Sequence, residues 1–290
     1  LLLTVYLVLS ESFFRLLVPP LSPFLGTLAF WASGSLALFS NVRRLAFSES
    51  VGLVSIIGII VFIFIAGLPR FLSLNPAPVL QFSFNYIFFP LAPVLFSLAG
   101  RVAIPALVRF LKRETNVQAR APAIRRAIVA GTCIPAIAYV LFAFGILGFT
   151  PFPTEDAVSG LAAHMGPVVL GVLGLLGLIA LWTSYIAVGA DVETSLNVDL
   201  RYPPYLRFSI IIGTPLLLYA GVAPSFLMLV SLTGGVLLAF EGIFIMRMWQ
   251  RARRTYAGVG LVHRVHPIAW SALWLVWTVA ILYELVTRIF

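Results

Sequence analysis

Charged residues are scarce in this chain. Only 10% of its 290 residues are Asp, Glu, Lys or Arg, against about 25% in a soluble domain. Hydrophobic residues make up 61% of the chain, and apolar runs follow one another along almost its whole length. The sequence therefore predicts a multi-pass membrane protein, and no stretch between the apolar runs is long enough for a separate soluble enzyme domain.

Cysteine and histidine are also scarce. The single cysteine, Cys133, falls inside an apolar run, and one cysteine cannot form a disulfide within the chain. The three histidines, His164, His263 and His266, fall in predicted loops without Cys or carboxylate neighbours at the spacing of a metal site. We therefore expect no bound metal and no cofactor.

Nine apolar runs approach the roughly 20 residues that a helix needs to cross a bilayer. They predict an all-α polytopic membrane protein with about nine transmembrane helices. The predicted spans are 1–17, 24–40, 51–68, 79–110, 124–148, 166–190, 206–222, 225–246 and 268–287.

The basic residues fall mostly on one side of these spans. If the loop after the second span faces the cytoplasm, fifteen of them are cytoplasmic, while Arg15, Arg70 and Arg288 are outside and Arg101 is left within the membrane. This bias matches the positive-inside rule. The net charge of +9 therefore faces anionic lipid head groups, and we expect no nucleic-acid partner.

The fourth span breaks in its own middle. Its apolar run stops at Leu98, meets Gly100 and Arg101, and resumes just before Pro105. Glycine tolerates unwound backbone, and proline removes a helical hydrogen-bond donor. Secondary transporters present such breaks, with half-helix ends and free carbonyls, to substrates and ions. An ordinary proline kink is the alternative.

The residues around this break resemble a known family. The run from Phe96 to Leu107, FSLAGRVAIPAL, is similar to the sixth helix of permeases in the amino acid–polyamine–organocation superfamily. It is most similar to the aromatic amino acid and amino acid–auxin permease branches. Segments resembling the seventh helix (131–139) and the eighth helix (182–189) follow in the expected order. Arg101 departs from the pattern, which often has histidine at this place.

This resemblance implies an inverted-repeat transporter fold of two five-helix repeats. Residues 1–68 would be the remaining three helices of the first repeat, and 79–246 the complete second repeat, with its first helix broken near 99–104. Residues 268–287 would form an additional C-terminal helix. Leu1 would then fall within the family's third helix, so that two helices would be missing and this chain alone would not transport.

The resemblance also implies secondary active transport of amino acids across the cytoplasmic membrane of a bacterium or archaeon. The expected mechanism is alternating access driven by a proton or sodium gradient. The expected partners are an amino acid substrate, aromatic or otherwise neutral, and membrane lipid. A membrane-embedded lipid-modifying enzyme and a non-transporting scaffold subunit are the alternatives.

The candidate site residues follow from the same resemblance. The broken segment and the first predicted span of this chain (1–17) would bind the substrate. The residues are Phe96, Ser97, Leu98, Ala99 and Gly100 from the broken segment and Tyr6 from the first span. Thr183 and Ser184 are candidates for ion coupling, because hydroxyl oxygens suit a hard cation. The alternative is that both hydroxyls bond back to carbonyls of their own helix. Glu241 is the third candidate, as an acid within a span.

Structural or gating roles are expected for Arg101, Pro105, Pro135 and Asp191. An arginine inside a membrane is costly and is usually paired with an acid. We therefore expect Arg101 to pair with Glu241 or Asp191, and a substrate carboxylate is the alternative partner.

Three smaller patterns predict local structure. Thr154, followed by two acids, indicates either the start of a short helix or a simple surface loop. Glycine recurs at every third residue across 171–177, which favours close helix packing. Tryptophans share one face of the last span across 270–277 and indicate packing or a lipid-facing surface.

Overall fold

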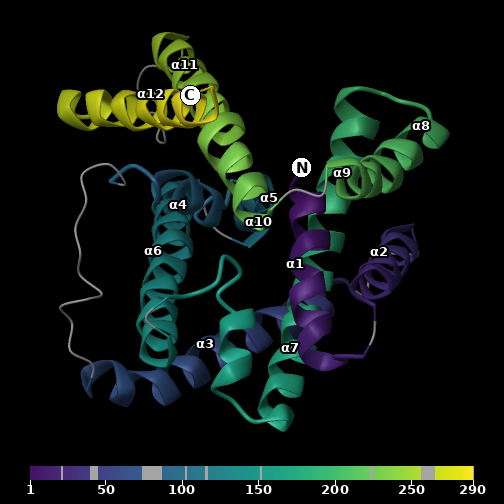
Figure 1. The fold of residues 1–290 in the computed structure, drawn as a ribbon. Helices are drawn as coiled ribbons and strands as arrows, with labels where there is room; N and C mark the ends of the chain where they lie inside the picture. The colour runs from purple at the N-terminus through teal and green to yellow at the C-terminus, as the bar shows by residue number, and fades with distance from the viewer. Residues whose placement is uncertain are drawn as a thin grey trace. The chain divides into compact units, whose positions relative to one another are not determined.

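A computed structural model of the chain confirms the all-α prediction (Figure 1). It describes residues 1–20, 22–39, 45–73, 87–101, 103–114, 117–150, 152–222, 225–255 and 265–289. These residues are mostly helical, and none of them lies in a β-strand.

Among the residues that the structure describes, five helices are long and apolar enough to cross a membrane, which indicates a multi-pass membrane protein. α2 (Pro23–Phe39) is apolar but shorter. Helix lengths alone therefore give fewer spans than the nine that were predicted, and the inverted repeat stays a prediction. The five are Ser50–Ser73, Ala121–Phe149, Pro167–Asp199, Phe226–Thr255 and Pro267–Thr287.

The chain forms two compact units, each built from two separated stretches. Unit 1 joins Leu1–Gln81 to Ala138–Leu229, and unit 2 joins Phe82–Ile137 to Val230–Phe290. The predicted repeats 1–68 and 79–246 divide the chain differently, and their boundaries stay a prediction.

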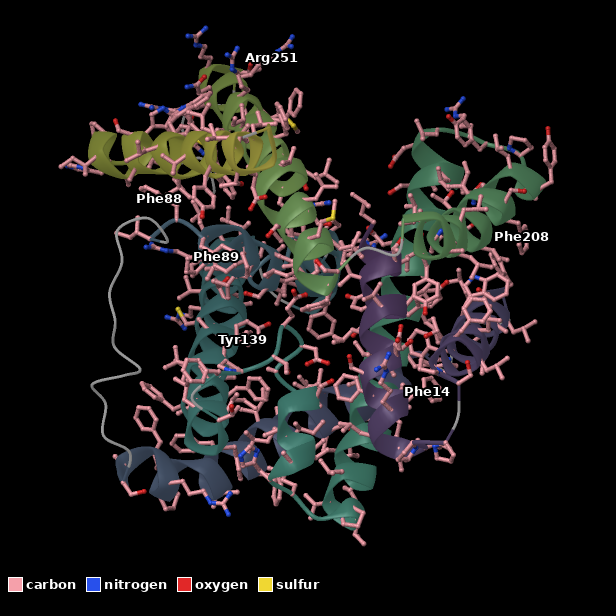
Figure 2. All side chains as sticks on the ribbon, viewed as in Figure 1. Phe14, Phe88, Phe89, Tyr139, Phe208 and Arg251 are labelled. Atoms are coloured by element: carbon pink, nitrogen blue, oxygen red, sulfur yellow. The ribbon has the colours of Figure 1, made fainter. Side chains whose placement is uncertain are left out.

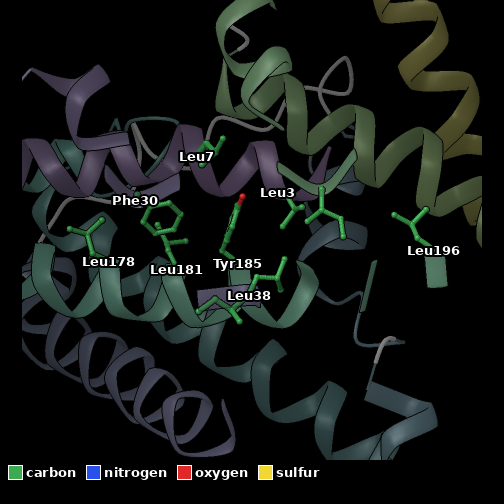
Figure 3. Packing of buried hydrophobic residues seen from close by; sticks show 10 residues of the cluster. Leu3, Leu7, Phe30, Leu38, Leu178, Leu181, Tyr185 and Leu196 are labelled. Atoms are coloured by element: carbon green, nitrogen blue, oxygen red, sulfur yellow. The ribbon is translucent and has the colours of Figure 1, made fainter. Parts of the chain in front are cut away.

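In unit 1, α1 packs along α7 and α2, while α3 also packs on α7. The centre of this packing is apolar: Leu7, Phe30, Tyr185 and Ile186 are buried there (Figure 3). In a membrane, close van der Waals packing of such side chains holds the helices together. The unit contains α1 (Leu2–Leu17), α2, α3 (Leu45–Ser73), the end of α6 (Val117–Phe149), α7 (Pro167–Thr194), α8 (Pro204–Phe208) and α9 (Thr214–Val222).

The glycine repeat on α7 has the predicted packing role at two of its three positions. A Cβ on Gly174 would lie 3.0 Å from the carbonyl oxygen of Phe13, and a Cβ on Gly177 would overlap the Phe13 ring. Gly171 meets no atom within 4 Å. α1 therefore approaches α7 closely only along the second half of this repeat.

The segment after α6 forms a tight loop that leads into a short 3-10 helix, η3 (Ser159–Ala163). The Asp156 carboxylate accepts hydrogen bonds from the Thr154 hydroxyl (2.7 Å) and from the Ser159 hydroxyl (2.5 Å) and N–H (3.2 Å). The helix thus begins later than the predicted start near Thr154, and Asp156 organises the turn before it.

These hydrogen bonds predict how acid affects unit 1. Burial raises the pKa of Asp156, but hydrogen bonds from Ser12, Ser159 and Thr154 outweigh it and leave the pKa below its ordinary value. The carboxylate therefore stabilises the fold above about pH 3.9, and this stabilisation is lost as pH falls through the lowered pKa. We expect D156N to lower stability at pH 7 by about 1 kcal/mol and to flatten the acid limb of the melting-temperature profile. Parallel profiles for D156N and wild type would contradict this assignment.

In unit 2, a π-helical segment, η6 (Leu232–Leu237), lies against α4 and α12. Gly234 packs on the backbone of Ala92, and Gly235 packs on the side chain of Glu284. Arg251 lies toward the end of α11, where exposed basic side chains gather (Figure 2). The other helices of this unit are α4 (Leu91–Ser97), α5 (Ala103–Glu114), the first part of α6, α11 (Leu238–Thr255) and α12 (Pro267–Ile289), and α10 (Phe226–Ser231) joins the two units.

Candidate functional site

The break predicted near 99–104 lies between α4 and α5. α4 ends at Ser97 and α5 begins at Ala103. Between them, the Gly100 N–H donates to the Leu98 carbonyl (2.8 Å), and the Ala103 N–H donates to the Gly100 carbonyl (3.2 Å). Pro105 lies in the first turn of α5, where its missing N–H would have no helical partner in any case.

The carbonyls at the end of α4 are partly used by this turn. The Phe96 carbonyl accepts from Ala99 (3.3 Å), and the Leu98 carbonyl accepts from Gly100. A carbonyl oxygen has two lone pairs, so each keeps one for a ligand. These second lone pairs meet part of the expectation of free carbonyls at the break.

A pocket of about 450 Å³ opens beside the break, wholly within unit 2. This volume lies within the range of small-molecule sites. Leu98, Ala99 and Gly100 line it from the break, and residues of α4, α5, α6, α11 and α12 form the rest of its described walls. Among the described lining residues, all are apolar or glycine except Thr132, Arg101 and Glu241, and the Thr132 hydroxyl bonds to a carbonyl of its own helix.

Arg101 and Glu241 form an ion pair in the wall of this pocket. The structure thus confirms Glu241 as the partner, whereas Asp191 belongs to α7 in unit 1. The arginine side chain is 49% exposed and the glutamate side chain 28% exposed. Both charges therefore stay accessible to a ligand from the pocket, and each compensates the other while no ligand is bound.

Two expected substrate-binding residues do not line the pocket. Phe96 packs on η6, since its Cβ lies 3.0 Å from where a Cβ on Gly234 would be. Ser97 donates its hydroxyl to the Val94 carbonyl (3.1 Å) within α4. Both lie on α4 just before the break. The described pocket lining skips these two residues and continues at Leu98.

Two of the ion-coupling candidates use their hydroxyls within their own helix. Thr183 and Ser184 both donate to the Ala180 carbonyl, at 3.0 and 2.9 Å. This is the alternative stated from the sequence, in which both hydroxyls bond back to carbonyls of their own helix. Glu241, the third candidate, is held by Arg101.

The remaining candidates lie apart from the pocket lining. Tyr6 is on α1 and packs against the core of unit 1. Asp191 is half-buried toward the end of α7, and Pro135 lies in the interior of α6. The structure therefore brings together Leu98, Ala99, Gly100, Arg101 and Glu241, and leaves the other expected residues outside this pocket.

Sequence reasoning missed one wall of the pocket. Trp277 lines it, and its indole lies on Gly242, so close that a Cβ there would overlap the ring. The regular tryptophan spacing on α12 had indicated packing or a lipid-facing surface, and not a pocket wall. The sequence signal for this wall was Glu241 followed by Gly242 within an apolar span. The glycine, next to the acid, leaves room for a large aromatic side chain.

Comparisons of this chain with models of known families, with curated proteins and with solved structures return no match. The function is therefore argued from the site itself.

Proposed function

We propose that this protein is a secondary transporter of amino acids, with its substrate site in the pocket beside the α4–α5 break. The observation that carries the proposal is the accessible Arg101–Glu241 pair in an otherwise apolar pocket. The broken helix and the resemblance to amino acid permeases support it.

The charge balance of the pocket favours a zwitterion. An arginine binds a carboxylate and a glutamate binds an ammonium group, each through charge-assisted hydrogen bonds. A zwitterion offers both groups and compensates both charges, whereas an amine or an acid alone leaves one charge without a new partner. The apolar lining and Trp277 then suit an apolar or aromatic side chain.

The proposed mechanism is alternating access in the cytoplasmic membrane of a bacterium or archaeon, driven by a proton or sodium gradient. The proposed fold is the inverted repeat, with about nine spans in this stretch of chain. The substrate binds to backbone groups of the break and to the charges of the ion pair. The pocket then closes on one side of the membrane and opens on the other.

Substitutions of the ion pair test this proposal when binding of an amino acid is compared with binding of its amine and acid analogues. In R101Q and E241Q, we expect binding of L-phenylalanine to weaken at least about tenfold, or 1.4 kcal/mol. The two variants should differ in their residual preference. R101Q leaves the carboxylate and favours phenethylamine, while E241Q leaves the guanidinium and favours 3-phenylpropionate.

Binding is measured by titration calorimetry on purified protein expressed from its complete reading frame. R247Q is the matched control, because Arg247 is exposed on the same helix and lies outside the pocket lining. Equal affinities in wild type, R101Q and E241Q, all folded, would remove the ion pair from the site.

A further inference from the structure

The positive charge of this chain lies on unit 2. Residues 82–137 and 230–290, which form that unit, contain thirteen Lys and Arg and three acids, whereas unit 1 contains six Lys and Arg and seven acids. Between Glu241 and Glu284 the sequence has no acid at all. This acid-free stretch holds the end of α11 and most of α12. Unit 2 therefore attracts an anionic partner, and this stretch has no acid of its own to compensate its arginines.

Three arginines lie at the end of α11 within this stretch. Arg251, Arg253 and Arg254 are exposed, and the helix ends at Thr255. Figure 2 shows Arg251 at this end. None of the three forms an ion pair with a described acid. The guanidinium group presents its N–H donors in a planar fork that fits the oxygens of a phosphate, so this end of the helix suits a phosphate ligand.

Two tryptophan rings lie beside these arginines. Trp249 of α11 and Trp270 of α12 are in contact, with 5.0 Å between ring centroids. The Arg253 guanidinium lies over the Trp249 ring, 5.6 Å from its centroid. Neither ring is fully buried. Tryptophan is enriched where a membrane meets water, because its ring sits at the level of the lipid head groups. The aromatic pair therefore marks this end of α11 as a head-group position.

The face of α11 that carries Arg251 is apolar in the preceding turns. Phe244 and Met248 precede Arg251 by seven and three residues, so the three side chains share one face of the helix. Phe244 is 65% exposed and Met248 is 69% exposed. Both belong to the candidate span Phe226–Thr255, and the arginines end that span. This order matches a phospholipid, with its acyl chains inside the membrane and its phosphate at the surface, whereas a free phosphate would use the arginines alone.

We propose that the end of α11, together with the start of α12, binds an anionic phospholipid. Arg251 and Arg254 share a face of the helix and bind the phosphate through charge-assisted hydrogen bonds. Phe244 and Met248 contact an acyl chain. A zwitterionic head group compensates its own phosphate with an ammonium group, whereas an anionic head group leaves a net negative charge for the arginines. These residues lie outside the described lining of the substrate pocket, so the site does not depend on the proposed transport function.

Native mass spectrometry tests the proposal on protein expressed from its complete reading frame and purified in detergent. The protein is titrated with dioleoylphosphatidylglycerol or dioleoylphosphatidylcholine, and the apparent Kd of the first bound lipid is measured. We expect phosphatidylglycerol to bind at least about tenfold more tightly, and R251Q/R254Q to remove this preference. R125Q/R126Q is the matched control, because it removes two exposed arginines from α6 in the same unit and should keep the preference.

Three results would overturn the proposal. Equal affinity of the wild type for the two lipids means that the protein does not select an anionic head group. Equal losses of the preference in R251Q/R254Q and R125Q/R126Q mean a general attraction to the basic surface, with no site on α11. Full competition by glycerol 3-phosphate, which has the phosphate without acyl chains, means that the arginines bind a soluble phosphate and not a lipid.

Discussion

Replacing Gly100 with leucine is expected to weaken substrate binding at least about 100-fold, or 2.7 kcal/mol, while the protein still folds. Gly100 lines the pocket, and a Cβ built on it meets no atom within 4 Å. The added Cβ therefore causes no clash, and a leucine side chain at this place takes up pocket space that the substrate needs. The measurement is calorimetric binding of L-phenylalanine, with the melting temperature recorded on the same sample.

The matched control for this variant is G58L. Gly58 of α3 also meets no atom within 4 Å, but it lies in unit 1 and outside the pocket. G58L should fold and bind as wild type does. If G100L binds the amino acid as well as G58L does, the pocket beside the break is not the substrate site.

Replacing Gly145 with alanine is expected to destabilise unit 1 by about 3 kcal/mol or more. A Cβ on Gly145 of α6 would lie 2.7 Å from the Ile63 carbonyl oxygen of α3, and one on Gly67 would overlap the Gly145 carbonyl. These neighbours are backbone atoms of an adjacent helix, so they cannot move aside as a flexible side chain does. Overpacking of this kind costs about 1–3 kcal/mol even among side chains, and here two helices must separate.

G58A is the control for this second variant. It lies on the same helix as Gly67, where a Cβ meets open space, and alanine favours a helix over glycine by about 1 kcal/mol. We expect the melting temperature of purified protein to fall in G145A and to hold or rise in G58A. A G145A protein as stable as wild type would show that α3 and α6 do not cross at this contact.

The broken helix was predictable because its cause is local. Gly100 and Pro105 weaken the helical ladder whatever surrounds them, and the structure interrupts the helix between Ser97 and Ala103. The pairing of Arg101 with an acid was predictable from the cost of an arginine among apolar residues. Its choice of Glu241 over Asp191 depends on which helices meet, and the sequence pattern left that open.

Features set by tertiary packing escaped the sequence. The π-helical segment η6 exists where Gly234 and Gly235 let Ala92 and Glu284 approach its backbone closely. Its residue pattern still resembles an ordinary apolar span. Trp277 lines the pocket because Gly242 on the neighbouring helix leaves room for its ring. Such residues depend on contacts between helices that are far apart in sequence.

Uptake into proteoliposomes tests the central claim most directly. Protein expressed from its complete reading frame is reconstituted, and accumulation of labelled L-phenylalanine and other neutral amino acids is followed under an imposed proton or sodium gradient. The account predicts accumulation that collapses with the gradient and is lost in R101Q and G100L but kept in R247Q. Folded wild-type protein that accumulates no amino acid under either gradient would contradict it.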